Sequence, residues 1–549
     1  MRLIGDAAVA VFFAYDKDRA RRADLPDLSL AAGGEAWDRL QQRAVSLEGG
    51  EHPVRPFHWE IEFPEVFARD NPGFDAIVGN PPFAGKNTTI AGNREHYLEW
   101  LQHLHTGAHG NADLVAHFFR RAFGMIRDGG SFGLIATNTI GQGDTRETGL
   151  CAIIASGGAI THAVKRLKWP GEAAVVVSVV HLVKGEAEWP TLDDRPVRRV
   201  SAYLVEGDLD ESPPVLSENA EISFKGSELH GVGFMFDDDG AEKAICEPLS
   251  KAEEVIAVRP SSAERIKPFF SGEDFNNSVT FESSRLVFDL GDLELDEARD
   301  RFPELLAIAE QWVKPIREKD NRPARKERWW RFGERASGLY SAIRSKEQVL
   351  CTLFTSPHMN FALIDGDRIF ANAMVVTTLD SCASFASLQS RAHEVWARFF
   401  SSSMKDDLRY APSDCFETFP LPPGYDSAPA LEAAGEAYHA HRAAMMVTTN
   451  KGMTKTYNRF HDPHDKAADI VTLRRLHAAM DDAVLRAYGW DDLAGRAAGG
   501  DAPRFLTEDD EDDHKYQKRL FWPAPFRDEL LARLLKLNEE RAAAEKAGN

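Results

Sequence analysis

The sequence predicts an α/β fold, in which part of a doubly wound sheet is followed by an α+β region and a helical C-terminal region. The apolar run FDAIV at 74–78 lies between glycine and proline, which indicates a short buried strand. A helical pattern at 111–126, the stop Gly129-Gly130 and an apolar run at 131–137 form the helix–strand pair expected beside it. Beyond 429, apolar residues recur at helical spacing.

The chain of 549 residues is too long for one ordinary core, so we expect several domains. A polar, proline-punctuated stretch near 193–210 and the change of pattern near 429 divide the chain into 1–195, 196–428 and 429–549. We expect no membrane span, because no run of about 18 apolar residues occurs. The apolar start of the chain is typical of a buried helix and lacks the basic region of a signal peptide.

Charge and cysteine usage narrow the function classes further. A net charge of −21 argues against nucleic-acid binding over the whole protein surface. It permits binding through one local basic face. Part of the acidic excess lies in the run 508–513, which we expect to be a solvated loop. The five cysteines are scattered without metal-ligand spacing, which fits a reducing cytoplasm and no structural metal.

The N-terminal part of the chain is expected to lead into the sheet. Residues 1–50 have a helical pattern. In PFHWEIEFPEVF at 56–67, Trp59, Ile61 and Phe63 alternate with glutamates, which predicts a half-buried strand. His58 and the glutamates of this stretch are expected to be solvated.

The turn that follows the strand at 74–78 has unusual chemistry. In Asn80-Pro81-Pro82-Phe83, two prolines remove two N–H donors, so the backbone presents carbonyl acceptors. Asn80 adds an amide and Phe83 adds a flat ring. Rigid acceptors beside an aromatic ring suit a planar group with an exocyclic amine. The alternative is an ordinary proline turn.

FDAIVGNPPF resembles the catalytic motif of amino-group DNA methyltransferases, above all the N6-adenine type of large type IIG-like restriction-modification and phage-defence enzymes. The resemblance implies that Asn80 and the Pro81 carbonyl hold the amino group of a flipped-out base on which Phe83 stacks. It therefore assigns Asn80, Pro81, Pro82 and Phe83 to the catalytic site of a partial Rossmann-like methyltransferase sheet. PFHWEIEFPEVF and ATNTIGQGDTRE at 136–147 also resemble segments of these enzymes.

Two further elements are expected near this site. Asn111 or Asp113 caps the helix at 111–126, on which Leu114, Phe118, Ala122 and Met125 share a face. Residues 138–146 leave the carboxyl end of the next strand, where ligands lie in such sheets. WPGEA at 169–173, before a fully buried strand at 175–183, resembles a turn beside the target-base pocket. Trp169 either lines that pocket or packs at the end of the sheet.

The methyl donor implied by the family is S-adenosylmethionine, which needs a glycine-rich strand-to-helix turn and a following acidic residue. None of the 79 residues before Asn80 forms that turn, so the cofactor-binding residues are unknown. We expect a second polypeptide to carry the cofactor half; the alternatives are a truncated gene and an inactive relic. An unpaired sheet edge would then be exposed.

The region 196–428 is expected to recognise a DNA target. Its GEDFN turn at 272–276 and its DCFETFPLPP segment at 414–423 resemble parts of recognition modules. Basic residues interleaved with tryptophans at 314–344 suit phosphate contact and base stacking; the structural alternative is a wet basic face with a core tryptophan. Lys455 lies in TKTYN at 454–458, which also resembles these proteins. The predicted DNA-binding residues are Arg322, Arg325, Lys326, Arg328, Trp329, Trp330, Arg331 and Lys455.

The sequence thus predicts a site-specific adenine-N6 DNA methyltransferase with double-stranded DNA as its substrate. One alternative is a DNA-specificity subunit without catalysis. Another is a methyltransferase for a glutamine amide of a protein, against which the large recognition region argues. The leucine-rich helix at 526–547 is either a docking helix for a partner or a packed end of the chain.

Overall fold

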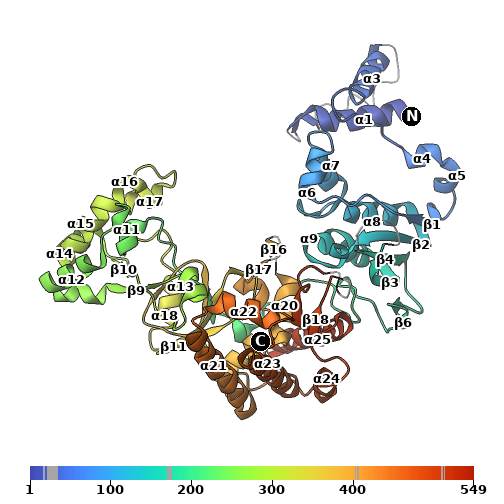
Figure 1. The fold of residues 1–549 in the computed structure, drawn as a ribbon. Helices are drawn as coiled ribbons and strands as arrows, with labels where there is room; N and C mark the ends of the chain where they lie inside the picture. The colour runs from blue at the N-terminus through green and yellow to red at the C-terminus, as the bar shows by residue number, and fades with distance from the viewer. Residues whose placement is uncertain are drawn as a thin grey trace. The chain divides into compact units, whose positions relative to one another are not determined.

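The computed structural model describes residues 1–16, 19–21, 35–169, 176–401, 403–404, 407–508, 511 and 513–548. The chain divides into two compact units, Met1–Ser212 and Pro213–Asn549 (Figure 1). Each unit has its own sheets and helices. The division into 1–195, 196–428 and 429–549 stays a prediction.

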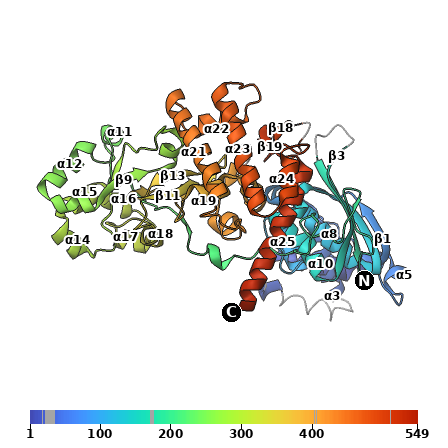
Figure 2. The same ribbon diagram turned by 90° about the horizontal axis from the view of Figure 1, so that it is seen from below.

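The first unit is built on a six-stranded sheet in the order β1-β2-β4-β3-β5-β6. β1 and β2 are parallel, and α8 connects them, as the predicted helix–strand pair requires. β4 runs antiparallel to both β2 and β3, so the sheet is mixed. α8 and α10 lie on one face of it (Figure 2). The strands are β1 (Phe74–Gly79), β2 (Ile126–Thr137), β3 (Gly158–Lys168), β4 (Val176–Lys184), β5 (Thr191–Leu192) and β6 (Arg195–Pro196). The nearby helices are α6 (Lys86–Ala91), α7 (Tyr97–Leu104), α8 (Leu114–Met125), α9 (Gly143–Arg146) and α10 (Ala152–Ala155).

Two predicted burial patterns in this unit are wrong in detail. Phe118 of α8 is 40% exposed, because Val115, Phe119 and Phe123 form the buried stripe instead. β4 is a strand, as predicted, but its two faces differ: Val180 and Leu182 are buried, and the residues between and after them are only half-buried.

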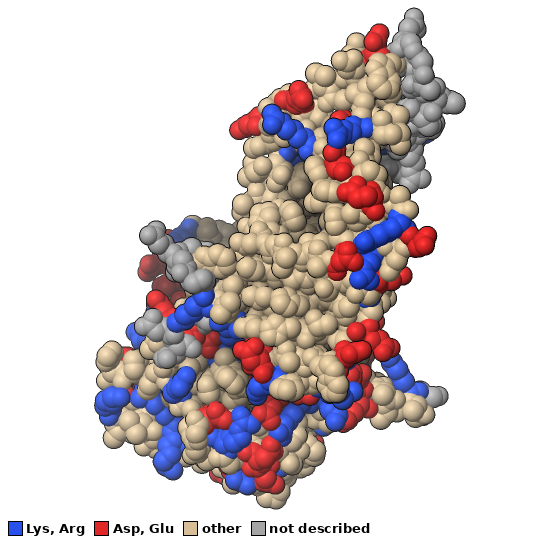
Figure 3. Space-filling model, turned by 90° about the vertical axis from the view of Figure 1, so that its right-hand side faces the viewer, with Lys and Arg blue, Asp and Glu red and all other residues tan. Residues whose placement is uncertain are grey.

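The predicted burial of the strand at 74–78 is also wrong in this structure. β1 pairs with β2 on one side, and within the described ranges no strand pairs with its other side. Val78 is 84% exposed. The middle of the face drawn in Figure 3, on the side where Figure 1 places β1, carries few charged side chains. β1 is therefore an edge strand that exposes Val78 and, among its residues, carries one charged side chain, that of Asp75, which pairs with Arg69 and Arg127.

The stretch before β1 forms two short helices, α4 (Trp59–Glu62) and α5 (Pro64–Phe67), and not the predicted strand. Trp59, Phe63 and Phe67 are spaced by four residues, so helical turns bring all three against Phe74, with ring centroids 5.4–5.7 Å away. Pro64 begins α5, where its missing N–H costs nothing. The alternation of apolar and charged residues predicted a strand. The four-residue spacing of the aromatic residues, which is helical, instead matches the observed structure.

The N-terminal helices α1 (Arg2–Ala14) and α3 (Glu35–Ser46) confirm the helical pattern over the described part of 1–50. His58 Nε2 lies 2.8 Å from Asp6 Oδ1, so this histidine ties α4 to α1 and is not simply solvated. Gly5 permits the approach, because a Cβ there would lie 2.5 Å from the His58 ring. None of the helices within the described ranges is long and apolar enough to span a membrane.

The second unit begins with an α+β region, as predicted. One four-stranded sheet has the order β14-β9-β10-β8 and another the order β13-β11-β15-β7. The strands are β7 (Ser223–Lys225), β8 (Met235–Phe236), β9 (Ile266–Phe270), β10 (Leu286–Phe288), β11 (Gln348–Leu353), β13 (Ala362–Asp365), β14 (Ile369–Phe370) and β15 (Met374–Thr377). Its helices include α12 (Leu249–Val258), α13 (Gly272–Asn277), α14 (Leu295–Arg301), α15 (Pro303–Trp312), α17 (Pro323–Glu327), α18 (Ser337–Ala342), α19 (Cys382–Gln389) and α20 (Arg391–Phe400). The GEDFN segment is α13, which Ser271 and Asp274 cap reciprocally.

The C-terminal part of this unit is mainly helical, as predicted. It comprises α21 (Pro429–Thr449), α22 (Met453–His461), α23 (Ala468–Ala487), α24 (Asp491–Ala497) and α25 (Ala524–Gly548), with a hairpin of β18 (Arg504–Leu506) and β19 (Arg519–Phe521). Leu530, Leu534 and Leu535 of α25 are buried within the unit. This burial favours the prediction that α25 packs against its own unit over the prediction that it docks a partner. The acidic run is not simply solvated, because Glu511 is 1% exposed and pairs with Arg527 over 2.7 Å.

Candidate functional site

The turn Asn80–Phe83 follows β1 at the end of the sheet where the carboxyl ends of β1 and β2 lie. Pro81 is buried and Phe83 is half-buried against the core of the unit, so the turn is anchored. Asn80 is exposed, and neither its amide nor the Pro81 carbonyl makes a hydrogen bond with any described residue. The turn therefore offers two acceptors beside an anchored aromatic ring.

The exit from this turn is fixed by the N-terminus of α8. The backbone N–H of Ala84 donates to Asp113 Oδ1 over 3.2 Å, and the N–H of Leu114 donates to the Ala84 carbonyl over 2.9 Å. Asp113 Oδ1 also accepts from the Val115 N–H over 3.0 Å, which makes Asp113 the cap of α8. The sequence indicated only the capping role of Asp113, because capping residues follow a local pattern and the contact with Ala84 does not.

Other polar residues leave the sheet at the same end. Ser178 Oγ donates to Asn138 Oδ1 over 2.8 Å, directly after β2. β2 and β3 both run antiparallel to β4, so they are parallel to each other, and Trp169 follows β3 at that end. Trp169 is half-buried, and residues 170–175 of its turn lie outside the described residues. Its place in a base pocket stays a prediction.

The described residues do not form a complete S-adenosylmethionine site. Such a site needs a glycine-rich turn and a carboxylate on strands beside β1. The outer side of β1 has no described neighbour strand, Gly5 lies inside α1, and Gly49 and Gly50 follow α3 in a turn. The described residues of the unit thus present acceptors for an amino group but no complete set of groups for the methyl donor.

The predicted stacking role of Trp329 and Trp330 is wrong in this structure. The two rings are 8% and 5% exposed and belong to the hydrophobic core of the α+β region. Trp330 Nε1 donates to the Leu293 carbonyl over 2.9 Å. Buried indoles satisfy their N–H in this way, so these side chains stabilise the fold and do not face a base.

Two of the predicted arginines are also engaged within the protein. Arg331 donates to the Leu293 carbonyl over 2.8 Å and pairs with Glu294 over 2.9 Å. Arg325 is 12% exposed and lies 3.9 Å from carboxylates of Asp320 and Glu228. The run of basic residues led to the prediction of DNA contact. The carboxylates that pair with Arg325 and Arg331 include Glu228 and Glu294, which come from other segments and could not be recognised as partners from the sequence.

The remaining predicted DNA-binding residues are accessible. Arg322, Lys326 and Arg328 are exposed on and beside α17 and make no ion pair with a described residue. Lys455 is exposed on α22. The DNA-binding role of these four residues stays a prediction.

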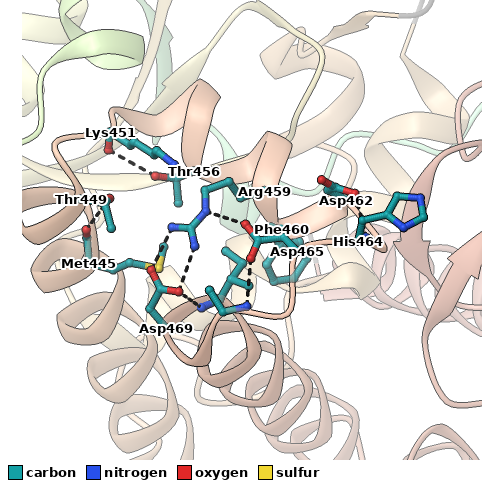
Figure 4. Close-up of polar contacts among 12 residues, drawn as sticks. Met445, Thr449, Lys451, Thr456, Arg459, Phe460, Asp462, His464, Asp465 and Asp469 are labelled. Atoms are coloured by element: carbon teal, nitrogen blue, oxygen red, sulfur yellow. Dashed lines mark hydrogen bonds and ion pairs between the residues drawn. The ribbon is translucent and has the colours of Figure 1, made fainter.

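Arg459, four residues after Lys455, has a structural role. Its Nε pairs with Asp465 over 2.7 Å and its two terminal nitrogens with Asp469 over 2.9 Å (Figure 4). The Arg459 hydrogen bonds lower the pKa of both carboxyls. This cluster ties α22 to the start of α23 and engages three of the five N–H donors of Arg459 within the unit.

Two segments of the chain are similar to known protein families. Residues 31–150 match the family described as Eco57I restriction-modification methylase, and residues 231–423 match the family described as MmeI, target recognition domain. A curated relative, DNA methyltransferase A of Bacillus subtilis (strain 168), is 20% identical over 382 residues, or 66% of this chain and 40% of that protein. The solved structure of the type IIL restriction-modification enzyme MmeI in complex with DNA matches 95% of this chain and 65% of its own, at 17% identity and a TM-score of 0.52.

The chain spans less than two thirds of the length of either relative. The structural match shows a shared fold, and the two family matches cover the turn Asn80–Phe83 and the α+β region respectively. The chain therefore joins a segment similar to the Eco57I restriction-modification methylase family to a segment similar to the MmeI target recognition domain.

Proposed function

We propose that the chain takes part in methylation of adenine N6 in double-stranded DNA within a restriction-modification or phage-defence system. One observation supports this most directly: the Asn80 amide and the Pro81 carbonyl are unengaged among the described residues, next to the anchored ring of Phe83. Two acceptors and an aromatic plane match the amino edge and the face of a flipped-out adenine.

The chain's own residues hold the reacting amine. Asn80 Oδ1 and the Pro81 carbonyl accept the two N–H groups of the adenine amine, and Phe83 stacks on the ring. As the nitrogen gains positive charge, these fixed acceptors stabilise the transition state more than the ground state. Asp113 keeps the exit of the turn in place through Ala84.

The methyl source in this proposal is S-adenosylmethionine, and a second polypeptide supplies its site. The exposed apolar edge of β1 supports such a partner, because unpaired edges of this kind readily add a strand. A partner that pairs with β1 would place its own strand ends beside Asn80.

The test uses the chain co-expressed with the polypeptide encoded next to it, in a host whose DNA lacks N6-methyladenine. Sequencing that detects this base should find methylation at one recurring target, and Asn80→Ala should abolish it while DNA binding remains. Asn87→Ala is the matched control, since Asn87 is an exposed asparagine seven residues further along. If the Asn80→Ala variant methylates DNA as well as the wild type, Asn80 does not hold the reacting amine.

A second candidate is a DNA-specificity subunit that does not catalyse. This candidate is favoured because the described residues form no complete cofactor site. Binding of DNA by the co-expressed proteins without methylation at any site would select this candidate. The glutamine-amide alternative loses support, because residues 231–423 match a target recognition domain.

A further inference from the structure

A basic hollow lies in the α+β region, where Arg335 and Arg344 from the end of the segment 314–344 meet residues of other segments. It has a volume of about 320 Å³ and is formed by residues that start β9, flank α18 and precede β14. We name it the Arg265 pocket, after the arginine that enters it from before β9. Its six cations are Arg265, Lys267, Arg335, Arg344, Lys346 and Arg368.

The lining has more positive than negative groups. Three carboxylates, those of Glu264, Asp289 and Asp367, face the six cations. In a chain with a net charge of −21, a concave site with this excess is unusual. Concave sites lined by one sign of charge concentrate ions of the opposite sign.

Half of the cations are already neutralised. Lys267 pairs with Asp367 over 2.7 Å, and Lys346 pairs with Asp380 over 2.8 Å. Arg335 donates to both Asp289 and Asp292, which fixes it as part of the wall. These pairs hold the shape of the pocket.

The other three cations keep unused donors. Arg344 is exposed and forms no ion pair within the described residues. The nearest carboxylate to the Arg265 guanidinium is Glu264, at 3.6 Å, and Arg265 Nε has no hydrogen-bond partner in the described residues. Arg368 Nη1 donates to the Phe281 carbonyl, whereas its buried Nε has no hydrogen-bond partner in the described residues. Its nearest carboxylate, that of Asp365, is 3.9 Å away.

We propose that the Arg265 pocket binds a phosphodiester group of the DNA backbone, with Arg265, Arg344 and Arg368 as its donors. Guanidinium groups match the geometry of phosphate oxygens and carry no sequence information, so the contact would position the duplex. The one aromatic ring among the described lining residues belongs to Tyr340, whose hydroxyl is bonded to Ser227 and to the Phe370 N–H. A nucleobase would find no free plane for stacking, which favours a phosphate alone.

The proposal rests on the proposed function only in taking DNA as the ligand. The experiment measures binding of the full chain to two fluorescein-labelled duplexes of unrelated sequence over a range of salt concentrations. The variants are Arg344→Gln, Arg265→Gln with Arg344→Gln, and Arg344→Lys. Arg299→Gln is the control, because Arg299 is an exposed arginine of the same region outside the pocket.

Loss of one phosphate contact should lower the slope of log K against log[salt] by about 1 and weaken binding equally on both duplexes. We expect this for the double variant and a smaller effect for Arg344→Gln, with recovery in Arg344→Lys and none of it in Arg299→Gln. Arg344 is exposed, so its variant should fold even if Arg265→Gln does not.

Two outcomes would overturn the proposal while the proposed function stands: equal slopes for the wild type and both glutamine variants, or a change that Arg299→Gln reproduces. A further experiment measures the stability of the wild type and of the double variant as inorganic phosphate is added at constant ionic strength. Stabilisation of the wild type but not of the double variant, together with unchanged DNA slopes, would show a small-anion site and would also overturn it. Failure of the wild-type chain to bind DNA at all would instead contradict the proposed function.

Discussion

The carboxylate of Asp113 accepts a hydrogen bond from the backbone N–H of Ala84, the residue that directly follows Phe83. The same oxygen caps α8 through Val115. The start of α8 and the end of the Asn80–Phe83 turn are therefore held by one side chain. This contact joins α8, whose residues belong to the core of the unit, to the turn that carries Asn80.

Replacement of Asp113 by alanine should cost about 1 kcal/mol of stability, as loss of a helix cap does. It should also lower methylation by up to about 100-fold, because the turn loses its fixed exit and a small displacement of catalytic groups is costly. Asp113→Asn keeps a hydrogen-bond acceptor, so it should retain most of the stability and most of the methylation rate. Denaturant unfolding and methylation rates of the assembled enzyme measure the two effects.

The matched control for this prediction is Ser381→Ala. Ser381 caps α19 in the second unit through the Ser384 N–H, over 3.0 Å. It should lose a similar stability with no loss of rate. If Asp113→Ala and Ser381→Ala reduce the rate equally, Asp113 has no positioning role.

Trp330 should matter for stability and not for base stacking. Trp330→Ala should lower the free energy of unfolding by roughly 3–5 kcal/mol, since it empties a core position. Trp330→Phe should cost about 1 kcal/mol through the hydrogen bond to Leu293 and leave DNA affinity unchanged. Arg328→Gln should do the opposite, with weaker DNA binding and a stability change within about 0.5 kcal/mol. Weaker DNA binding by a stably folded Trp330→Phe would restore the stacking role.

The turn Asn80–Phe83, the helix–strand pair and the helical C-terminal region could be predicted from local sequence, because each depends on residues close together in the chain. The partners of Arg325 and Arg331 could not, since Glu228 and Glu294 come from other segments. The same reason hid the link between Asp113 and Ala84, which are 29 residues apart. The exposure of β1 depends on which strands are its neighbours, and no pattern within FDAIVG records that.

The pair of Arg391 and Asp481 is a strong candidate for a stability-determining contact in the second unit. Their side chains are 2% and 3% exposed and lie 2.5 Å apart. Asp481→Ala should destabilise the unit by roughly 3–5 kcal/mol, because it leaves a buried arginine uncompensated. Asp296→Ala, which breaks the exposed pair with Arg299, should cost at most about 1 kcal/mol. Equal losses in urea unfolding would contradict this ranking.

Acid should destabilise the second unit before its carboxylates protonate. Burial, reinforced by Arg519, lowers the pKa of His358 from its ordinary 6.5 to about 4, and burial lowers the pKa of His393 to about 4 as well. The unfolded chain therefore takes up these protons at a higher pH than the folded chain. The contribution of the neutral histidines is complete above about pH 6.5 and is lost as the pH falls towards 4.

Urea unfolding at pH 7 and pH 5 tests this prediction. The free energy of unfolding should be clearly lower at pH 5, and His358→Gln should reduce the difference. His464→Gln serves as the control, because His464 is exposed. A pH dependence that His358→Gln leaves unchanged would show that other groups cause it.

The exposed edge of β1 predicts a specific effect of charge at Val78. A side chain that is 84% exposed contributes little to the isolated chain, so Val78→Lys should change its stability by less than about 0.5 kcal/mol. A lysine beside an unpaired edge opposes strand addition. Val78→Lys should therefore reduce both self-association of the isolated chain in light scattering and its co-purification with the neighbouring polypeptide. Ile90→Lys, at an exposed apolar residue of α6, should change neither. If Val78→Lys co-purifies as well as the wild type, β1 is not the surface at which the second polypeptide joins.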